Sequence, residues 1–129
     1  MEFENNMYFW QKLDTLILST EINVTQPKDS VHPKYANLVY PVDYGCLSDT
    51  LATNGDKVDV VIGTMKPQRA NAVVVACDIL KKDIEVKLLL GCTEQEELEI
   101  LHFINQTDFQ KGIILHRGNN IPSWAVDDN

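Results

Sequence analysis

Apolar residues near the start of the chain recur at spacings of three and four, which predicts an amphipathic helix that lies against the core. Asn5 and Asn6 are suitable caps for its N-terminus. The apolar positions are Phe9, Trp10, Leu13, Leu16 and Ile17. Thr93 and Glu96 have the spacing of a capping box and predict the start of a second helix. Its apolar stripe is Leu98, Leu101 and Ile104.

Short apolar and β-branched runs outside these helices predict strands. They cover residues 21–25, 37–42, 57–64, 72–80, 82–90 and 112–116. Pro33 interrupts the segment 28–35, which we expect to be a loop. Five or six short strands with two helices predict an α+β fold, in which a small mixed β-barrel is flanked by the helices.

Residues 82–90 alternate between polar and apolar side chains, as expected for a strand with two different faces. Asp83, Glu85 and Lys87 share one face. Ile84, Val86 and Leu88 share the other face, which we predict to be the core side. The polar face is therefore expected either to be exposed to solvent or to form part of a functional site.

The composition indicates one domain covering residues 1–129, because 129 residues with 44% hydrophobic content suffice for one core and not for two. The formal net charge of -8 disfavours a nucleic-acid partner. A bound anion therefore requires a local basic pocket or bridging cations. A divalent cation is the simplest answer.

The three cysteines are odd in number and lack a CxxC pair, which argues against a disulfide framework and a zinc site and favours the reducing cytoplasm. No stretch is long enough to span a membrane, and the acidic start is unlike a secretory signal. We therefore expect a cytoplasmic protein with no membrane partner. The sequence leaves the oligomeric state open, a homo-oligomer included.

The segment 40–59 combines two tyrosines, glycine turns and spaced carboxylates. It resembles the Tyr-Pro-x-x-Tyr-Gly and Asp-Gly-Asp-x-x-Asp runs of the soluble, magnesium-dependent inorganic pyrophosphatases. The matching residues are Tyr40, Pro41, Tyr44, Gly45, Gly55, Asp56 and Asp59, with Asn54 in the first acidic position. The resemblance implies a five-stranded barrel of the OB type and Mg²⁺-dependent hydrolysis of pyrophosphate or a related phosphoanhydride.

Hydrolysis of a phosphoanhydride requires charge neutralisation and an activated water, and hard cations held by carboxylates supply both. The predicted metal ligands are Asp56, Asp59, Asp83 and Glu85, with Asn54 as a weaker one. The predicted catalytic residues are Asp59, Asp56 and Tyr44, and the predicted substrate-binding residues are Lys87, Tyr40 and Lys34. The resemblance implies these roles, since Asp83, Glu85 and Lys87 match a later acidic pair and lysine of the family.

The run of His32, Pro33, Lys34 and Tyr35 before Tyr40 is similar to a compact subgroup of pyrophosphatase-like proteins. Val31 and His32 stand where the family carries an arginine, and Gln106 and Thr107 stand where it carries a Tyr-Lys pair. The phosphate clamp is therefore thinned, which leaves low activity open.

Other interpretations remain at this stage. Acidic residues in glycine turns and on exposed strand faces are often only solvated, and the tyrosines are equally suited to the core. The histidines lack metal-ligand spacing, so structural roles are favoured for His32, His102 and His116. The main alternative is a catalytically degenerate protein that keeps the barrel and binds a ligand or partner. A nucleic-acid-binding barrel is disfavoured by the charge.

Overall fold

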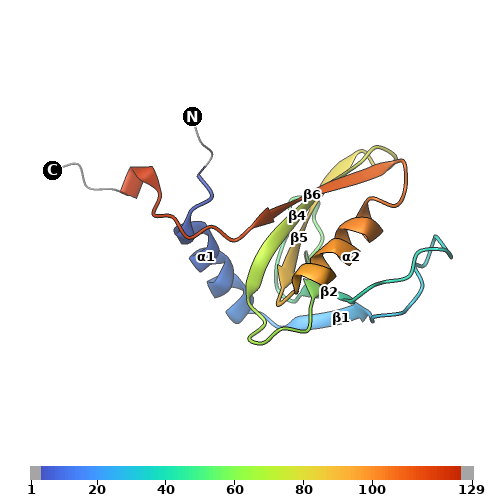
Figure 1. Ribbon diagram of the computed structural model, residues 1–129, viewed down its shortest axis with the longest axis horizontal. Helices are drawn as coiled ribbons and strands as arrows, with labels where there is room; N and C mark the ends of the chain where they lie inside the picture. The colour runs from blue at the N-terminus through green and yellow to red at the C-terminus, as the bar shows by residue number, and fades with distance from the viewer. Residues whose placement is uncertain (1–3, 126–129) are drawn as a thin grey trace.

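The computed structural model describes residues 4–125, in which two α-helices and six strands are found (Figure 1). The elements in chain order are α1 (Met7–Leu18), β1 (Ile22–Gln26), β2 (Asp43–Leu47), β3 (Val58–Ile62), β4 (Ala70–Asp78), β5 (Asp83–Leu90), α2 (Glu94–Ile104), β6 (Gln110–His116) and the short 3-10 helix η1 (Ser123–Ala125). Among the described residues, neither α-helix has the length and apolar character needed to cross a membrane.

All six strands form one mixed sheet in the order β1-β2-β3-β5-β4-β6. Neighbouring strands are antiparallel except β3 and β5, which run parallel. The predicted α+β class with two helices and a mixed sheet is confirmed. The strand count is six rather than five, and the sheet is open because β1 and β6 lie at its opposite ends.

Side chains, rather than another strand, form hydrogen bonds with backbone groups on the outer edge of β6. The Gly112 N–H donates to Oδ1 of Asn105 at 2.9 Å, and Nδ2 of Asn105 donates back to the Gly112 carbonyl at 3.4 Å. Near the other end of β6, Nδ2 of Asn5 donates to the His116 carbonyl at 2.6 Å. These bonds occupy outward backbone groups at Gly112 and His116 that pairing with a further strand would use.

The predicted strand at residues 37–42 is wrong, whereas the other five predicted strands correspond to β1, β3, β4, β5 and β6. Residues 27–42 form a long loop in which Val39 makes only an isolated bridge with Val31. The Tyr40 N–H donates to the Ser30 carbonyl inside this loop. Pro41 has no N–H to donate to a ladder, and regular pairing begins only at Asp43.

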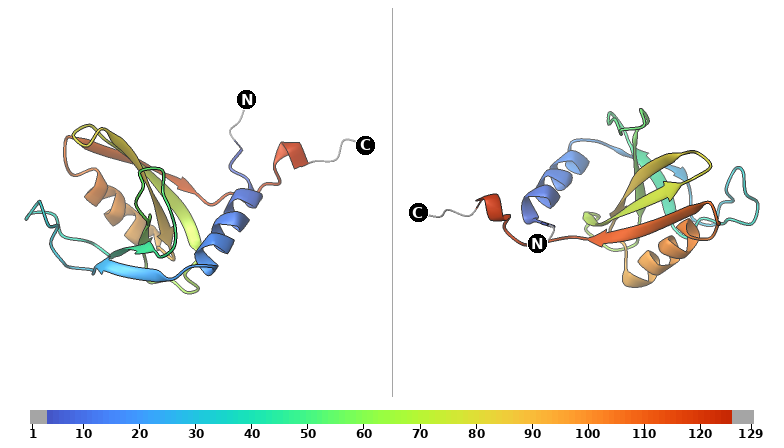
Figure 2. Two further views of the ribbon diagram at one scale, coloured as in Figure 1. Left: turned by 180° about the vertical axis from the view of Figure 1, so that it is seen from behind. Right: turned by 90° about the horizontal axis from the view of Figure 1, so that it is seen from above.

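The two helices pack on opposite faces of the sheet, as Figures 1 and 2 show. On α1, the predicted cap is confirmed, since the side chain of Asn6 accepts from the Phe9 N–H. The buried residues Trp10, Leu13 and Ile17 of α1 contact one face. On α2, the predicted capping box of Thr93 and Glu96 is present. Ile100 and Ile104 of α2 pack on the other face, with Tyr44, Val61 and Leu89.

The prediction for the two faces of β5 is wrong over its first half. Ile84 and Val86 are 63% and 49% exposed, whereas Glu85 and Lys87 are half-buried on the α2 side. Only Leu88 joins the core as predicted. The reason is the reach of the helices: α1 covers the sheet around Leu88 and leaves the start of β5 open. On the α2 side, ion pairing makes burial of charged groups tolerable.

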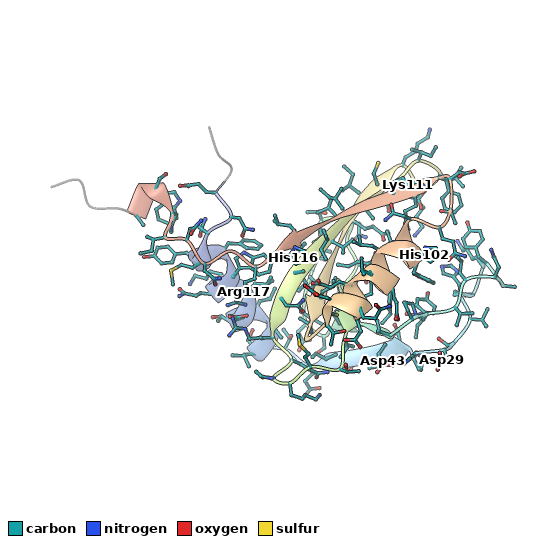
Figure 3. All side chains as sticks on the ribbon, viewed as in Figure 1. Asp29, Asp43, His102, Lys111, His116 and Arg117 are labelled. Carbon is teal, nitrogen blue, oxygen red and sulfur yellow. The ribbon has the colours of Figure 1, made fainter. Side chains whose placement is uncertain are left out.

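An ion pair joins the end of the sheet to α1. Arg117, which follows β6 and is labelled beside α1 in Figure 3, donates from both terminal nitrogens to the carboxylate of Asp14. A third bond runs from Arg117 to the Ala70 carbonyl at 2.9 Å. The hydrogen bonds from Arg117 lower the pKa of Asp14. This pair therefore fixes the position of α1 against β4.

We expect Asp14→Asn to lower the free energy of unfolding at pH 7 by about 1 kcal/mol, because a bidentate, half-buried pair is lost. The pKa of Asp14 is depressed in the folded state, so this stabilisation is present above the unfolded pKa of about 3.9 and disappears as the pH falls through the folded value. Urea unfolding at pH 7 and at low pH checks both parts. The exposed Asp108→Asn is the charge-matched control, and an equal loss in both variants would contradict the assignment.

Candidate functional site

A cleft of about 590 Å³ opens on the α2 side of the sheet. Its walls come from β1, β2, β3 and β5, from the loop before β2, and from the end of α2. Its charged residues are Asp56, Lys57, Asp59, Lys81, Glu85 and Lys87. The lining therefore carries equal numbers of carboxylates and ammonium groups.

The parallel pairing of β3 with β5 creates the charged floor of this cleft. Asp59 and Lys87 are register partners, so both side chains leave the sheet on the same face. Nζ of Lys87 lies 3.3 Å from Oδ2 of Asp59 and 3.3 Å from Oε2 of Glu85. Lys81, from the turn between β4 and β5, places Nζ 3.4 Å from Oε1 of Glu85. The four groups form a chain of alternating charge.

Glu85 is the most tightly held carboxylate of this chain. Its side chain is only 15% exposed, and burial alone would favour the neutral acid. The charges of Lys87 and Lys81 outweigh that effect and lower the pKa of Glu85. In turn, Glu85 raises the pKa of Lys81 against the opposing effect of burial. Both groups are therefore charged at neutral pH.

Tyr40 and Tyr44 form the aromatic wall of the cleft, with ring centroids 4.8 Å apart. The side chain of Tyr44 is buried, and its hydroxyl has no hydrogen-bond partner among the described residues. Burial raises the pKa of both tyrosines, so both hydroxyls are neutral donors. A buried hydroxyl without a partner is costly. A ligand in the cleft would remove that cost at Tyr44.

A second cavity of about 440 Å³ adjoins the cleft. The two share four lining residues, His32, Lys81, Phe103 and Gln110. The ring of His32 stacks on Tyr40 with an interplanar angle of 11°. Burial and the nearby charges of Lys81 and Lys34 lower the pKa of His32, which favours the neutral imidazole. The aromatic wall therefore continues from one cavity into the other.

The structure brings most of the predicted site residues together. Those lining the cleft are Tyr40, Tyr44, Asp56, Asp59, Glu85 and Lys87. Lys34 instead lines the second cavity. Asn54 lies in the turn before β3, where its side chain accepts from the Asp56 N–H at 3.0 Å. Asp83, at the start of β5, borders a separate hollow beside Cys77 and Ile84. Burial is the main cause that raises the pKa of Asp83, and the negative charge of Glu85 is the second.

Among the cleft residues that were not predicted as site residues are Lys81, His32 and Phe103. Lys81 stands four residues before Glu85. This spacing predicts an ion pair only if the position of the turn between β4 and β5 is already known. The structural role predicted for His32 rests on the lack of metal-ligand spacing, and nothing local indicates that its loop folds over the tyrosines. Phe103 belongs to the expected helix but not to its predicted stripe. Its placement in the cleft depends on the packing of α2.

The donor set does not fit a resident cluster of metal ions. Among residues 4–125, no three His, Cys, Asp or Glu side chains lie close enough to hold one cation. Lys87 occupies the space between Asp59 and Glu85, where a cation would have to lie. Asp56 is exposed, and within the same described part of the chain its carboxylate makes no ion pair or hydrogen bond. Asp56 and Asp59 both line the cleft, and Mg²⁺ is commonly held by one or two carboxylates together with phosphate oxygens.

Comparison with solved structures confirms the expected fold. The chain is similar to inorganic pyrophosphatases from Thermus thermophilus (18% identity, TM-score 0.53, covering 76% of this chain and 81% of that one) and Helicobacter pylori (15%, 0.51, 78% and 82%). The pyrophosphatase from Coxiella burnetii is similar at 16% identity and a TM-score of 0.51, covering 75% and 82%. No family model and no curated protein sequence matches the chain. At these identities, the likeness concerns the fold.

We expect Lys87→Met to raise the pKa of Glu85, because only the more exposed Lys81 would remain beside a half-buried carboxylate. The free energy of unfolding at pH 7 should fall by about 2 kcal/mol. The native pKa of Glu85 is depressed, so the deficit should shrink as the pH falls below the unfolded value of about 4.3.

Urea unfolding at pH 7 and pH 3.5, with an NMR titration of the glutamate carboxyl carbons, measures both effects. Lys57→Met is the matched control, since Lys57 lines the same cleft but is exposed. A deficit that is independent of pH would show that Lys87 acts through packing rather than through its charge.

Proposed function

We propose that this chain hydrolyses inorganic pyrophosphate, or a related phosphoanhydride, in the cleft on the α2 side of the sheet. The observation that carries the proposal is the lining of that cleft, in which Tyr44, whose buried hydroxyl has no partner among the described residues, stands together with three ammonium groups. Phosphate oxygens are acceptors that match both kinds of donor. The likeness in fold to three inorganic pyrophosphatases supports the same substrate.

Each residue has a role that follows from its position. Lys81 and Lys87 contact phosphate oxygens, and the neutral hydroxyls of Tyr44 and Tyr40 donate to the oxygens that gain charge as the bond breaks. Asp59, on the outer side of its pair with Lys87, accepts a proton from the attacking water. The water oxygen forms a bond to one phosphorus, the bridging P–O bond breaks, and the departing phosphate leaves with the electron pair.

Charge balance indicates how Mg²⁺ takes part. The charged lining residues of the cleft sum to zero, so the several negative charges of pyrophosphate must be balanced by a cation that enters with it. Mg²⁺ is commonly held by one or two carboxylates together with substrate phosphates. We therefore propose that the substrate is the magnesium salt. Asp56 and Asp59 would hold the ion, which neutralises phosphate charge when bound.

One observation favours the degenerate alternative, a protein that binds pyrophosphate without hydrolysing it. Lys87 already neutralises both Asp59 and Glu85, so these carboxylates are less available to a cation or a proton. The alternative shares the cleft and its ligand with the leading proposal. It differs only in the absence of turnover.

We further propose that residues 1–129 act as one domain in the cytoplasm. The cysteines are all free, and burial raises the pKa of Cys92 to about 12, which makes its thiol unreactive. Free thiols suit a reducing compartment.

We expect purified protein to release phosphate from pyrophosphate in the presence of Mg²⁺ and to stop when EDTA is added. Asp59→Asn should lower kcat by about 100-fold or more, because the proton acceptor is lost. Phosphate release and calorimetric binding of pyrophosphate are measured side by side. Asp49→Asn is the control, since Asp49 is exposed outside the cleft and asparagine tolerates its positive φ.

The outcomes separate the interpretations. Binding of pyrophosphate without phosphate release supports the degenerate alternative. Full activity in a folded Asp59→Asn protein would refute the role of Asp59. Failure of the unmodified protein to bind pyrophosphate would refute both functions.

A further inference from the structure

The second cavity beside the cleft has no use in the hydrolysis of pyrophosphate alone. It measures about 440 Å³ and adjoins a cleft of about 590 Å³. Each volume falls within the range of roughly 300–1,000 Å³ that is typical of sites that bury a whole organic ligand. Pyrophosphate is far smaller. Lys81 lines both cavities, so a phosphate held at Lys81 would stand at the entrance to the second one.

Aromatic rings form the walls of this second cavity. Tyr35 lies 5.1 Å from His32 and 5.6 Å from Phe109, measured between ring centroids, and Phe103 completes the lining. His32, Tyr35, Phe103 and Phe109 are all half-buried, so part of each side chain is open to a ligand. Flat rings of this kind are surfaces on which nucleobases stack without needing a particular base.

One residue that lines the cavity also has a buried polar atom without a partner. Oγ1 of Thr107 is buried, and no hydrogen bond to it exists among the described residues. Thr107 lines the second cavity only. A hydroxyl both donates and accepts, so it can pair with the polar edge of a heterocycle. The cleft and the second cavity are thus each lined by a residue with an unpaired hydroxyl, Tyr44 and Thr107, and Lys81 lines both.

The loop that carries the aromatic wall is held in place by its own hydrogen bonds. The His32 N–H donates to the Leu38 carbonyl at 2.8 Å, and the Leu38 N–H donates to the Tyr35 carbonyl at 3.0 Å. Nδ1 of His32 accepts from the Lys34 N–H at 3.0 Å. A wall fixed before binding loses little entropy when a ring stacks on it.

We propose that the substrate of this site is a nucleoside diphosphate, with its diphosphate in the cleft and its base in the aromatic cavity. This inference rests on the proposed function, because the cleft must first accept a diphosphate. The phosphate attached to the sugar lies at Lys81, and the base stacks on the wall formed by His32, Tyr35 and Phe109. Water then attacks one phosphorus, the bridging P–O bond breaks, and a nucleoside monophosphate and phosphate leave.

Calorimetry with ADP, pyrophosphate and adenosine, each with Mg²⁺, tests the proposal without requiring turnover. We expect ADP to bind at least tenfold more tightly than pyrophosphate. Tyr35→Leu keeps an apolar side chain but removes a stacking surface. It should therefore lower the affinity for ADP at least fivefold and leave the affinity for pyrophosphate unchanged. Phe109→Leu repeats the test from the far wall of the cavity. Tyr8→Leu is the control, since Tyr8 contacts Trp124 away from both cavities.

The results distinguish this inference from the proposed function. If pyrophosphate binds and ADP binds no more tightly, the nucleotide assignment is overturned while the proposed function stands. If neither Tyr35→Leu nor Phe109→Leu discriminates between ADP and pyrophosphate, the aromatic cavity is not the base site. If neither compound binds to the unmodified protein, the proposed function itself fails.

Discussion

The ion chain on the α2 face of the sheet is the interaction on which the site depends. Lys87 lies between Asp59 and Glu85, and Lys81 completes the charge balance of Glu85. Without these partners, half-buried carboxylates on a sheet face would take up protons or destabilise the fold. Pairing keeps them charged and holds the lysines at the floor of the cleft. The same pairing also explains why a resident metal cluster does not fit.

The loop between β1 and β2 converts this polar floor into two connected cavities. Its hydrogen bonds place His32 over Tyr40, and Phe103 of α2 closes the wall from the other side. Hydrophobic packing of these rings keeps the hydroxyl of Tyr44 away from bulk water. A ligand therefore meets donors that are already positioned and poorly solvated, which strengthens each contact.

The opposite face of the sheet shows the cost of this arrangement. Ile84 and Val86 of β5 and Ile113 of β6 remain exposed, because α1 does not cover this part of the sheet. The free edge of β6 is protected differently, by hydrogen bonds from Asn105 and Asn5. The protein thus blocks strand addition at this edge while leaving an apolar face open.

The sequence by itself determined the local features: both helices with their caps, five of the strands, and the tyrosine and aspartate positions that meet in the cleft. The helices and strands depend on periodicity, capping chemistry and turn residues, which act over a few positions, whereas the tyrosine and aspartate positions were indicated by the resemblance to the pyrophosphatases. Only the tertiary structure decided which face of β5 is covered, because alternation gives two faces without saying where α1 and α2 lie. It also decided that Lys81, His32 and Phe103 belong to the site. Phe103 reaches the tyrosines from a distant segment, which no local pattern encodes, and the contacts of His32 and Lys81 depend on how the loop before β2 and the turn between β4 and β5 fold.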